Sequence, residues 1–478
     1  MRRSRLQSKR TKIVCTLGPA TSSTAMIEKL IMAGMNVARL NLSHGTLDEH
    51  AHFVKTIRNL SRRLEIEIAI LIDLPGPKYR TGKLKGDRAI LKKGAQIVFT
   101  TDQIEGDATK VSVNLPDLAK GAKVGDIVLL ADGEMQAKVV QINGSDVKCR
   151  ITAGGILTEG RGLVIPGMPT YGPFVTDDLH EKILFAIAQK PDYLALSFVT
   201  TSQNIADVRA LLRENSADIP IISKIERGEA VKNFKSILAA SDGVMVARGD
   251  LGVEIPLEKV PLVQKEIIRE CNRAGKPVIT ATEMLESMVK SARPTRAETT
   301  DVANAIFDGT DATMLSEETS VGEYPLEAVK MMDRIARQTE KKLPYELALS
   351  EKRTWFQQRT EELISYAACV AAHSLDARAI ILFTESGSTA ARVSKYRPRM
   401  NIVAMTTSEV VCRRLVLYWG VQPVLVDTPA SISELFDAAS ALSKRLGLAH
   451  PGDLIIITGG TPFGIKGTTN LLKVETVS

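Results

Sequence analysis

The chain has 478 residues and a formal net charge of +7, with 44% hydrophobic and 24% charged residues. These values are ordinary for a soluble globular protein, and the length predicts about three domains. There is no run of about 18 apolar residues, so no membrane span is expected; the absence of a long basic stripe with aromatics argues against nucleic acid as a partner. The positive charge favours anionic ligands such as phosphates. The five cysteines are scattered without a CxxC pair, which indicates free thiols of a reducing compartment.

Apolar runs alternate with helical patterns in the first 80 residues, after a basic tail over residues 1–10. The predicted strands cover residues 12–18, 37–42 and 68–74, and the predicted helices cover residues 25–33 and 50–64. In the second strand Arg39, Asn41 and Ser43 share one face, because successive side chains of a strand alternate. A polar face on a buried strand is unfavourable unless it lines a site. The pattern therefore predicts functional groups here.

The composition changes over residues 81–171, which are glycine-rich and alternating, with no convincing amphipathic helix. Asp132-Gly133 between two alternating runs predicts a β-hairpin, and Asn143-Gly144 predicts a second turn. We therefore expect an inserted all-β lid domain.

The strand and helix alternation resumes after residue 171. Five further strands are predicted at residues 192–198, 219–226, 242–250, 277–283 and 312–318. With the three earlier strands they make eight, each followed by a helix, which predicts a closed (β/α)8 TIM barrel over residues 11–80 and 172–345. An open doubly wound sheet is the alternative. Residues 355–478 predict a separate C-terminal α/β domain, with strands at residues 379–383, 402–405, 423–426 and 454–458.

Two adjacent strands of this barrel carry a notable pair of carboxylates. Lys224 and Glu226 are two residues apart on one strand and point to the same side. Asp250 follows Arg248 and Gly249 where the next strand gives way to a turn. Two such carboxylates suit a hard divalent cation, and the lysine can help to stabilise a developing enolate or phosphoryl charge. A surface salt bridge at the strand ends is the alternative.

Seven longer segments carry a family resemblance. They are NVARLNLSHG, DLPGPKYRTG, SKIERGEAV, VMVARGDLGVEI, ITATEMLESM, PTRAETTDVANAIFDGTDATMLSEET and TESGSTAARVSKYRP. In order and spacing they resemble the motifs of pyruvate kinase, over nearly the whole chain. The resemblance implies Mg2+-dependent phosphoryl transfer (Mn2+ being the alternative metal) from phosphoenolpyruvate to ADP. The products are pyruvate and ATP, in the last step of glycolysis, and the enzyme is expected to be a cytoplasmic homotetramer.

The resemblance also implies residue roles. Glu226 and Asp250 match the metal ligands, and Lys224 matches the lysine that offsets charge on the phosphoryl group and the enolate. Thr282 matches the hydroxyl near the carbon that gains a proton, and Arg39 matches the clamp on the transferring phosphoryl group. The substrate carboxylate would bind the backbone of Gly249 and Asp250 at a helix N-terminus. The residues that match nucleotide contacts are Asn41, Ser43, His44 and Arg80.

Lys78 stands where many family members have a glutamate and bind K+ nearby, and Leu74 replaces a hydroxyl ligand of that ion. The ammonium of Lys78, beside Asn41, Ser43 and Asp73, can supply the missing monovalent charge. We therefore expect activity without K+, as in the lysine-bearing branch of the family. A solvated lysine in a turn is the alternative.

Three residues depart from the family pattern, and each adds negative charge. Asp178 replaces a lysine near the nucleotide phosphates, with Lys182 four residues on either as its substitute or as its ion-pair partner. Glu283 replaces a glutamine beside Thr282, and Glu317 replaces a small residue. Because negative charge near phosphates disfavours their binding, we expect an active enzyme with altered nucleotide affinity.

A loop of the C-terminal domain has the composition of a phosphate cradle, with hydroxyls, a glycine and a helix N-terminus. Its residues are Thr384, Ser386, Gly387, Ser388 and Thr389. In the family this loop binds a phosphorylated effector and faces the segment 461–469. Glu385 argues against a bisphosphate, so a sugar monophosphate or AMP is expected. A hydroxyl-capped helix start without a ligand is the alternative.

Two other functions fit the same residues. A metal-dependent barrel lyase with pyruvate enolate chemistry would turn over without ADP. A metabolite sensor that lost catalysis through Asp178, Glu283 and Glu317 would bind an effector without turnover.

Overall fold

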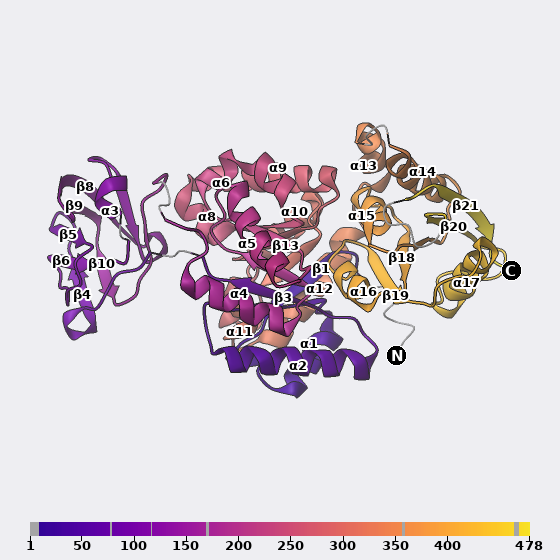
Figure 1. Ribbon diagram of the computed structural model, residues 1–478, viewed down its shortest axis with the longest axis horizontal. Helices are drawn as coiled ribbons and strands as arrows, with labels where there is room; N and C mark the ends of the chain where they lie inside the picture. The colour runs from indigo at the N-terminus through magenta and orange to yellow at the C-terminus, as the bar shows by residue number, and fades with distance from the viewer. Residues whose placement is uncertain (1–8, 77–78, 116, 169–171, 356–358, 463–467) are drawn as a thin grey trace.

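Three units follow one another along the longest axis of the molecule, with a β-rich lid at one end, a barrel in the middle and an α/β domain at the other end (Figure 1). The computed structural model describes residues 9–76, 79–115, 117–168, 172–355, 359–462 and 468–478. Within these residues, no helix is long and apolar enough to cross a membrane.

The central unit is a closed barrel of parallel strands in the order β1-β16-β15-β14-β13-β12-β3-β2. Its strands are β1 (Lys12–Thr16), β2 (Val37–Asn41), β3 (Ala69–Leu74), β12 (Tyr193–Leu196), β13 (Ile221–Ile225), β14 (Gly243–Ala247), β15 (Val278–Ala281) and β16 (Ala312–Leu315). Because β1 pairs with both β2 and β16, the sheet has no edge. The predicted barrel is confirmed, and the open-sheet alternative is excluded.

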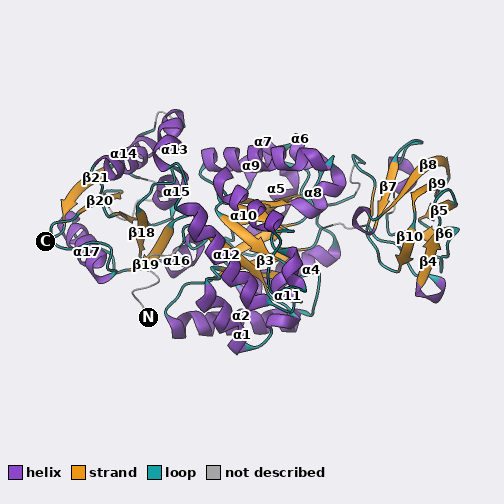
Figure 2. Ribbon diagram, turned by 180° about the vertical axis from the view of Figure 1, so that it is seen from behind, coloured by secondary structure: helices purple, strands orange, loops and turns teal. Residues whose placement is uncertain are grey.

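Helices surround the barrel and bury the outer faces of its strands (Figure 2). They are α1 (Thr24–Ala33), α2 (Leu47–Leu64), α4 (Asp177–Gln189), α5 (Ser202–Glu214), α6 (Gly228–Lys232), α7 (Phe234–Ala240), α8 (Arg248–Glu254), α9 (Val260–Ala274), α10 (Arg296–Asp308), α11 (Glu317–Ser320) and α12 (Pro325–Glu340). Helix α2 begins three residues earlier than predicted, because Thr46 and Glu49 form a capping box that satisfies the free backbone N–H groups of its first turn.

Seven of the eight barrel strands end before the predicted residue, among them β14 and β15, whose shortened ends carry predicted site residues. Strand β14 stops at Ala247 and the chain turns directly into α8, so Asp250 lies in the first turn of a helix. Strand β15 stops at Ala281, and the next two residues, Thr282 and Glu283, have left-handed φ values of 64° and 53°. Side chains disfavour this region, so neighbouring contacts must hold the turn in place.

The lid lies between β3 and α4 in the sequence and contains a larger mixed sheet and a smaller antiparallel sheet. The larger has the strand order β11-β7-β8-β9-β5-β6, and the smaller pairs β10 with β4. The strands are β4 (Arg88–Leu91), β5 (Gln96–Thr100), β6 (Lys110–Ser112), β7 (Ile127–Leu130), β8 (Met135–Asn143), β9 (Asp146–Ala153), β10 (Gly155–Thr158) and β11 (Leu163–Val164), with one short helix, α3 (Leu118–Gly121). Both predicted hairpins are confirmed, since β7 pairs with β8 and β8 with β9.

The C-terminal domain is a five-stranded sheet covered by helices on both faces. Its strand order is β19-β18-β17-β20-β21. The elements are α13 (Tyr345–Glu351), α14 (Thr360–Ser374), β17 (Ala379–Phe383), α15 (Ser388–Lys395), β18 (Asn401–Thr406), α16 (Glu409–Leu415), β19 (Val421–Leu425), α17 (Ile432–Arg445), β20 (Leu454–Gly459) and β21 (Leu471–Thr476). Strand β21, an antiparallel edge strand, was not predicted, because none of its residues is fully buried and Lys473 and Glu475 interrupt its apolar run.

The C-terminal domain closes the N-terminal end of the barrel. Val416 and Leu417, which follow α16, lie in one buried cluster with the inward side chains of the barrel strands. Asp311, just before β16, forms a buried ion pair with Arg397 at 2.8 Å. With this end occupied, a site that takes small molecules must lie at the opposite end, where the C-terminal ends of the strands meet.

Lys12 at the closed end predicts a pH-dependent stability. Its Nζ donates to the carbonyl of Val421 at 2.8 Å, and burial lowers its pKa from 10.5 to about 7. Between these values the unfolded chain holds a proton that the folded chain lacks, so the free energy of unfolding rises with pH. We expect the rise between about pH 7 and about pH 9.5 to be about 3 kcal/mol smaller in Lys12→Met, measured by urea unfolding. Parallel profiles for the two proteins would contradict this.

Candidate active site

A chain of buried charges crosses the open end of the barrel. Arg39 at the end of β2 donates through Nε and Nη2 to Asp73 Oδ2, both at 2.7 Å, and through Nη1 to Thr16 Oγ1 at 2.9 Å. Asp73, near the end of β3, also lies 3.4 Å from the Lys224 ammonium. Burial alone would raise the pKa of Asp73, but Lys224 and Arg39 outweigh it and hold the pKa below its usual value.

Lys224 joins this chain to Glu226. Its Nζ lies 2.9 Å from Glu226 Oε1 and donates to Ser197 Oγ at 2.7 Å. Burial alone would lower the pKa of Lys224, but Asp73 and Glu226 reverse the shift and raise it, so the ammonium stays charged. Sequence reasoning missed Ser197, although a serine directly after the apolar run of β12 is the kind of signal that marked the other strand ends.

Glu226 and Asp250 form the electrostatically unfavourable part of the site. Glu226 Oε2 accepts the backbone N–H of Phe198 at 2.5 Å. Burial raises the pKa of Glu226 to about 7; Lys224 opposes the shift and the negative charge of Asp250 adds to it. Two carboxylates that repel each other in this way are suitable donors for a hard divalent cation, which would offset both charges. Among the described residues there is no group of three or more potential protein ligands, so such a metal would need substrate or water oxygens as well.

The turn after β15 brings Thr282 against the start of α8. Thr282 Oγ1 accepts the backbone N–H of Gly249 at 2.8 Å. Arg248, which sequence reasoning did not assign, holds this turn through the carbonyls of Thr282 at 2.7 Å and Glu283 at 3.2 Å. It also pairs with Asp301 at 2.7 Å, so its side chain is fixed from two sides. The expected binding of a substrate carboxylate at Gly249 would replace the bond to Thr282.

The residues predicted to contact a nucleotide lie on two elements. Asn41 ends β2, and its Oδ1 accepts the N–H of Ser43 at 3.2 Å, which leaves Ser43 and His44 exposed on a turn. Arg80 lies at the lid hinge, where its Nη1 donates to the Gly160 carbonyl at 2.8 Å. Lys78, which was predicted to supply the monovalent charge, lies outside the described residues.

The departures from the family pattern have different surroundings. Lys182 donates to Asp178 at 2.8 Å on an exposed face of α4. Of the two alternatives for Lys182, the structure therefore favours the ion-pair partner of Asp178. Glu318, next to Glu317, is buried and accepts the backbone N–H groups of Leu285 and Ser316. That carboxylate therefore braces the loops after β15 and β16.

The C-terminal loop that was predicted to bind a phosphate forms a capped turn. Gly387 has a φ of 86°, and its N–H donates to Thr384 Oγ1 at 3.0 Å just before α15. Ser386 and Ser388 hydroxyls are 3.2 Å apart, and Thr389 contacts Thr469 Oγ1 at 2.8 Å. Residues 463–467 of the facing segment lie outside the described residues.

Known proteins with similar sequences and folds identify the family to which this chain is similar. Residues 8–329 match the family model described as pyruvate kinase, barrel domain, and residues 362–475 match pyruvate kinase, alpha/beta domain. A pyruvate kinase of Staphylococcus epidermidis is 45% identical over 471 residues, which cover 98% of this chain and 80% of that protein. One from Staphylococcus aureus is 46% identical over 471 residues, with the same coverage. The crystal structure of a pyruvate kinase from Cryptosporidium parvum has a TM-score of 0.94 and 38% identity, covering 99% of this chain and 97% of that chain.

Proposed function

The chain belongs to the pyruvate kinase family of phosphotransferases, and we propose that it transfers a phosphoryl group from phosphoenolpyruvate to ADP with Mg2+ as the metal. The observation that carries the mechanism is the run of buried charges from Arg39 through Asp73 and Lys224 to Glu226. A run of this kind provides positive charge beside a metal-binding pair of carboxylates. Such a transfer needs little covalent chemistry from the protein and depends on positioning and charge compensation.

Each side chain then has a defined task. Mg2+ at Glu226 and Asp250 would supply positive charge to the oxygens of the substrate. The Lys224 ammonium lies beside these carboxylates and compensates the negative charge that develops when the phosphoryl group leaves the enolate. Arg39, held in place by Asp73 and Thr16, binds the transferring phosphoryl group. The Thr282 hydroxyl directs the proton, through water, to the methylene carbon.

The first test is ADP-dependent pyruvate formation from phosphoenolpyruvate, with Mg2+ and without K+. Because we assign the monovalent charge to Lys78, we expect equal rates in Na+, K+ and tetramethylammonium. Strong activation by K+ would contradict the role of Lys78 alone and leave the reaction intact. Pyruvate formation that does not depend on ADP would favour a lyase, and effector binding without turnover would favour a sensor.

We assign regulation to the C-terminal loop from Thr384 to Thr389. Its hydroxyls and the start of α15 suit a phosphate group, and the negative charge of Glu385 favours a sugar monophosphate or AMP over a bisphosphate. We also propose, from the family, a homotetramer in the cytoplasm. Nucleotide affinity is expected to be weakened by the acidic residues Asp178, Glu283 and Glu317.

A further inference from the structure

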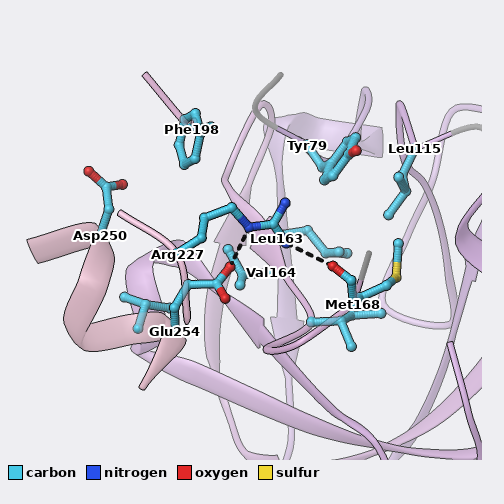
Figure 3. A pocket seen from close by; sticks show the side chains of 11 residues that line it. Tyr79, Leu115, Leu163, Val164, Met168, Phe198, Arg227, Asp250 and Glu254 are labelled. Carbon is cyan, nitrogen blue, oxygen red and sulfur yellow. Dashed lines mark hydrogen bonds and ion pairs between the residues drawn. The ribbon is translucent and has the colours of Figure 1, made fainter. Parts of the chain in front are cut away.

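A pocket separates the lid from the open end of the barrel, beside the proposed metal site (Figure 3). Its walls are mainly apolar lid residues, which include Leu115, Leu163 and Met168. Its barrel side carries Asp250, Phe198 and an ion pair between Arg227 and Glu254. The proposed reaction gives no task to that ion pair.

Arg227 connects the barrel to the exit linker of the lid, which is residues 162–168. Its Nε donates to Glu254 Oε1 at 3.1 Å, and its Nη2 donates to the carbonyl of Met168 at 3.0 Å. Met168 belongs to the buried core of the lid, whereas Arg227 directly follows the metal-binding Glu226 of the barrel. One guanidinium therefore contacts both domains (Figure 3).

Glu254 holds the same linker from the other side. Its carboxylate accepts the backbone N–H groups of Gly167 in the linker and of Gly228 at the start of α6. Glu254 is also the last residue of α8, whose first turn carries Asp250. The side chains of Arg227 and Glu254 are 9% and 6% exposed, so both charges are held away from water. Burying two charges is costly unless their hydrogen-bonding groups have partners. Here the carbonyl of Met168 and the N–H of Gly167 are such partners.

The exit linker is hydrogen-bonded to the entry linker of the lid at Arg80 and its neighbour Tyr79. The N–H of Leu163 donates to the carbonyl of Tyr79 at 2.9 Å, and Arg80 pairs with Gly162 as an antiparallel bridge. The entry and exit linkers of the lid are therefore one hydrogen-bonded ribbon. The backbone of Arg80 is therefore hydrogen-bonded to the same segment that Glu254 holds at Gly167.

We propose that the Arg227–Glu254 ion pair holds the lid linkers in position through its hydrogen bonds to Gly167 and Met168, and that this position sets the affinity of the site for ADP. We call the ion pair with these two backbone contacts the latch. The proposal rests on the proposed function in one respect, the role of Arg80 at the nucleotide. Arg227 and Glu254 act through the linkers and are not catalytic residues.

The test compares the double variant Arg227→Met/Glu254→Gln with wild type. The double change avoids leaving one buried charge unpaired, which would destabilise the fold. We expect the KM for ADP to rise about 10-fold or more, while the KM for phosphoenolpyruvate changes by less than about 2-fold. Arg227→Lys should recover only part of the loss, because an ammonium cannot repeat the forked contact to Glu254 and Met168.

Arg58→Met is the matched control, because Arg58 forms a similarly buried ion pair with Asp192 at 2.8 Å, at the closed end of the barrel. It should leave both KM values unchanged. Equal changes in both KM values, or none in the double variant, would overturn the proposal.

Two readouts do not need turnover. In the double variant, the affinity for ADP measured by calorimetry should fall by about the same factor by which the KM for ADP rises. Amide hydrogen exchange should become about 10-fold faster at residues 163–168, while exchange in β8 and β9 stays unchanged. If wild type forms no pyruvate, the proposed function fails, and these two measurements still decide the latch. Unchanged exchange in the linker, or faster exchange with unchanged ADP binding, would overturn it.

Discussion

Replacing Lys224 with methionine is expected to lower kcat by about 1000-fold. The ammonium lies 2.9 Å from Glu226, one of the two carboxylates proposed to bind the metal, and 3.4 Å from Asp73. Removing one preorganised group that stabilises transition-state charge costs about 100- to 1000-fold, and we assign this lysine to both the phosphoryl group and the enolate. The loss should persist at saturating Mg2+, because it arises from missing charge compensation. Steady-state pyruvate formation at saturating substrates measures it.

Lys276→Met is the matched control for this loss. Lys276 Nζ donates to the carbonyls of Leu238 and Ser241 at 2.7 Å, next to the N-terminal ends of the strands. Its removal deletes a partly buried ammonium without touching the open end of the barrel, so kcat should stay within about 3-fold of wild type. If Lys224→Met retained kcat to the same degree, the assignment of Lys224 would be wrong.

Replacing Glu226 with glutamine is expected to weaken metal binding by about 100-fold. Even partners of metal ligands contribute 10- to 100-fold in affinity, and this change removes a charged side chain that we propose as a ligand itself. The amide keeps the volume of the side chain and one oxygen for the N–H of Phe198, so the fold should survive. Binding of Mn2+ followed by electron paramagnetic resonance gives the affinity directly, and the Mg2+ dependence of turnover should shift in parallel.

Glu340→Gln controls for the loss of a buried carboxylate as such. Glu340 is buried at the closed end, where it accepts the backbone N–H groups of Arg10 and Thr11. Its replacement can lower stability, but the affinity for Mn2+ should not change. Wild-type Mn2+ affinity in Glu226→Gln would exclude Glu226 as a ligand.

The barrel and the identity of its central groups could be predicted because both follow from short-range patterns. Eight buried strands separated by helices leave few closed arrangements, and the two-residue period of a strand puts Lys224 and Glu226 on one side. The same local logic allowed two outcomes for Lys182, and only the helix geometry showed that it reaches Asp178.

Contacts between distant segments could not be predicted from the sequence. Asp73, predicted as part of a cation site, is an ion-pair partner of both Arg39 and Lys224. Ser197 bridges two of the same groups, with its hydroxyl donating to Asp73 Oδ1 at 3.3 Å. These partners meet only after the barrel has closed, since no periodicity in the chain records which strands become neighbours.

By itself, the sequence determined the type of fold, the family and the charged residues at the strand ends, because each is encoded in local pattern or in motifs. The tertiary structure decided how those charges are paired, where the barrel is closed by Val416 and Leu417, and that Arg227 and Glu254 hold the lid linker. The physical reason is that a buried charge takes its partner from whatever the packed fold brings within hydrogen-bonding distance. That neighbourhood is a property of the closed barrel and the docked domains.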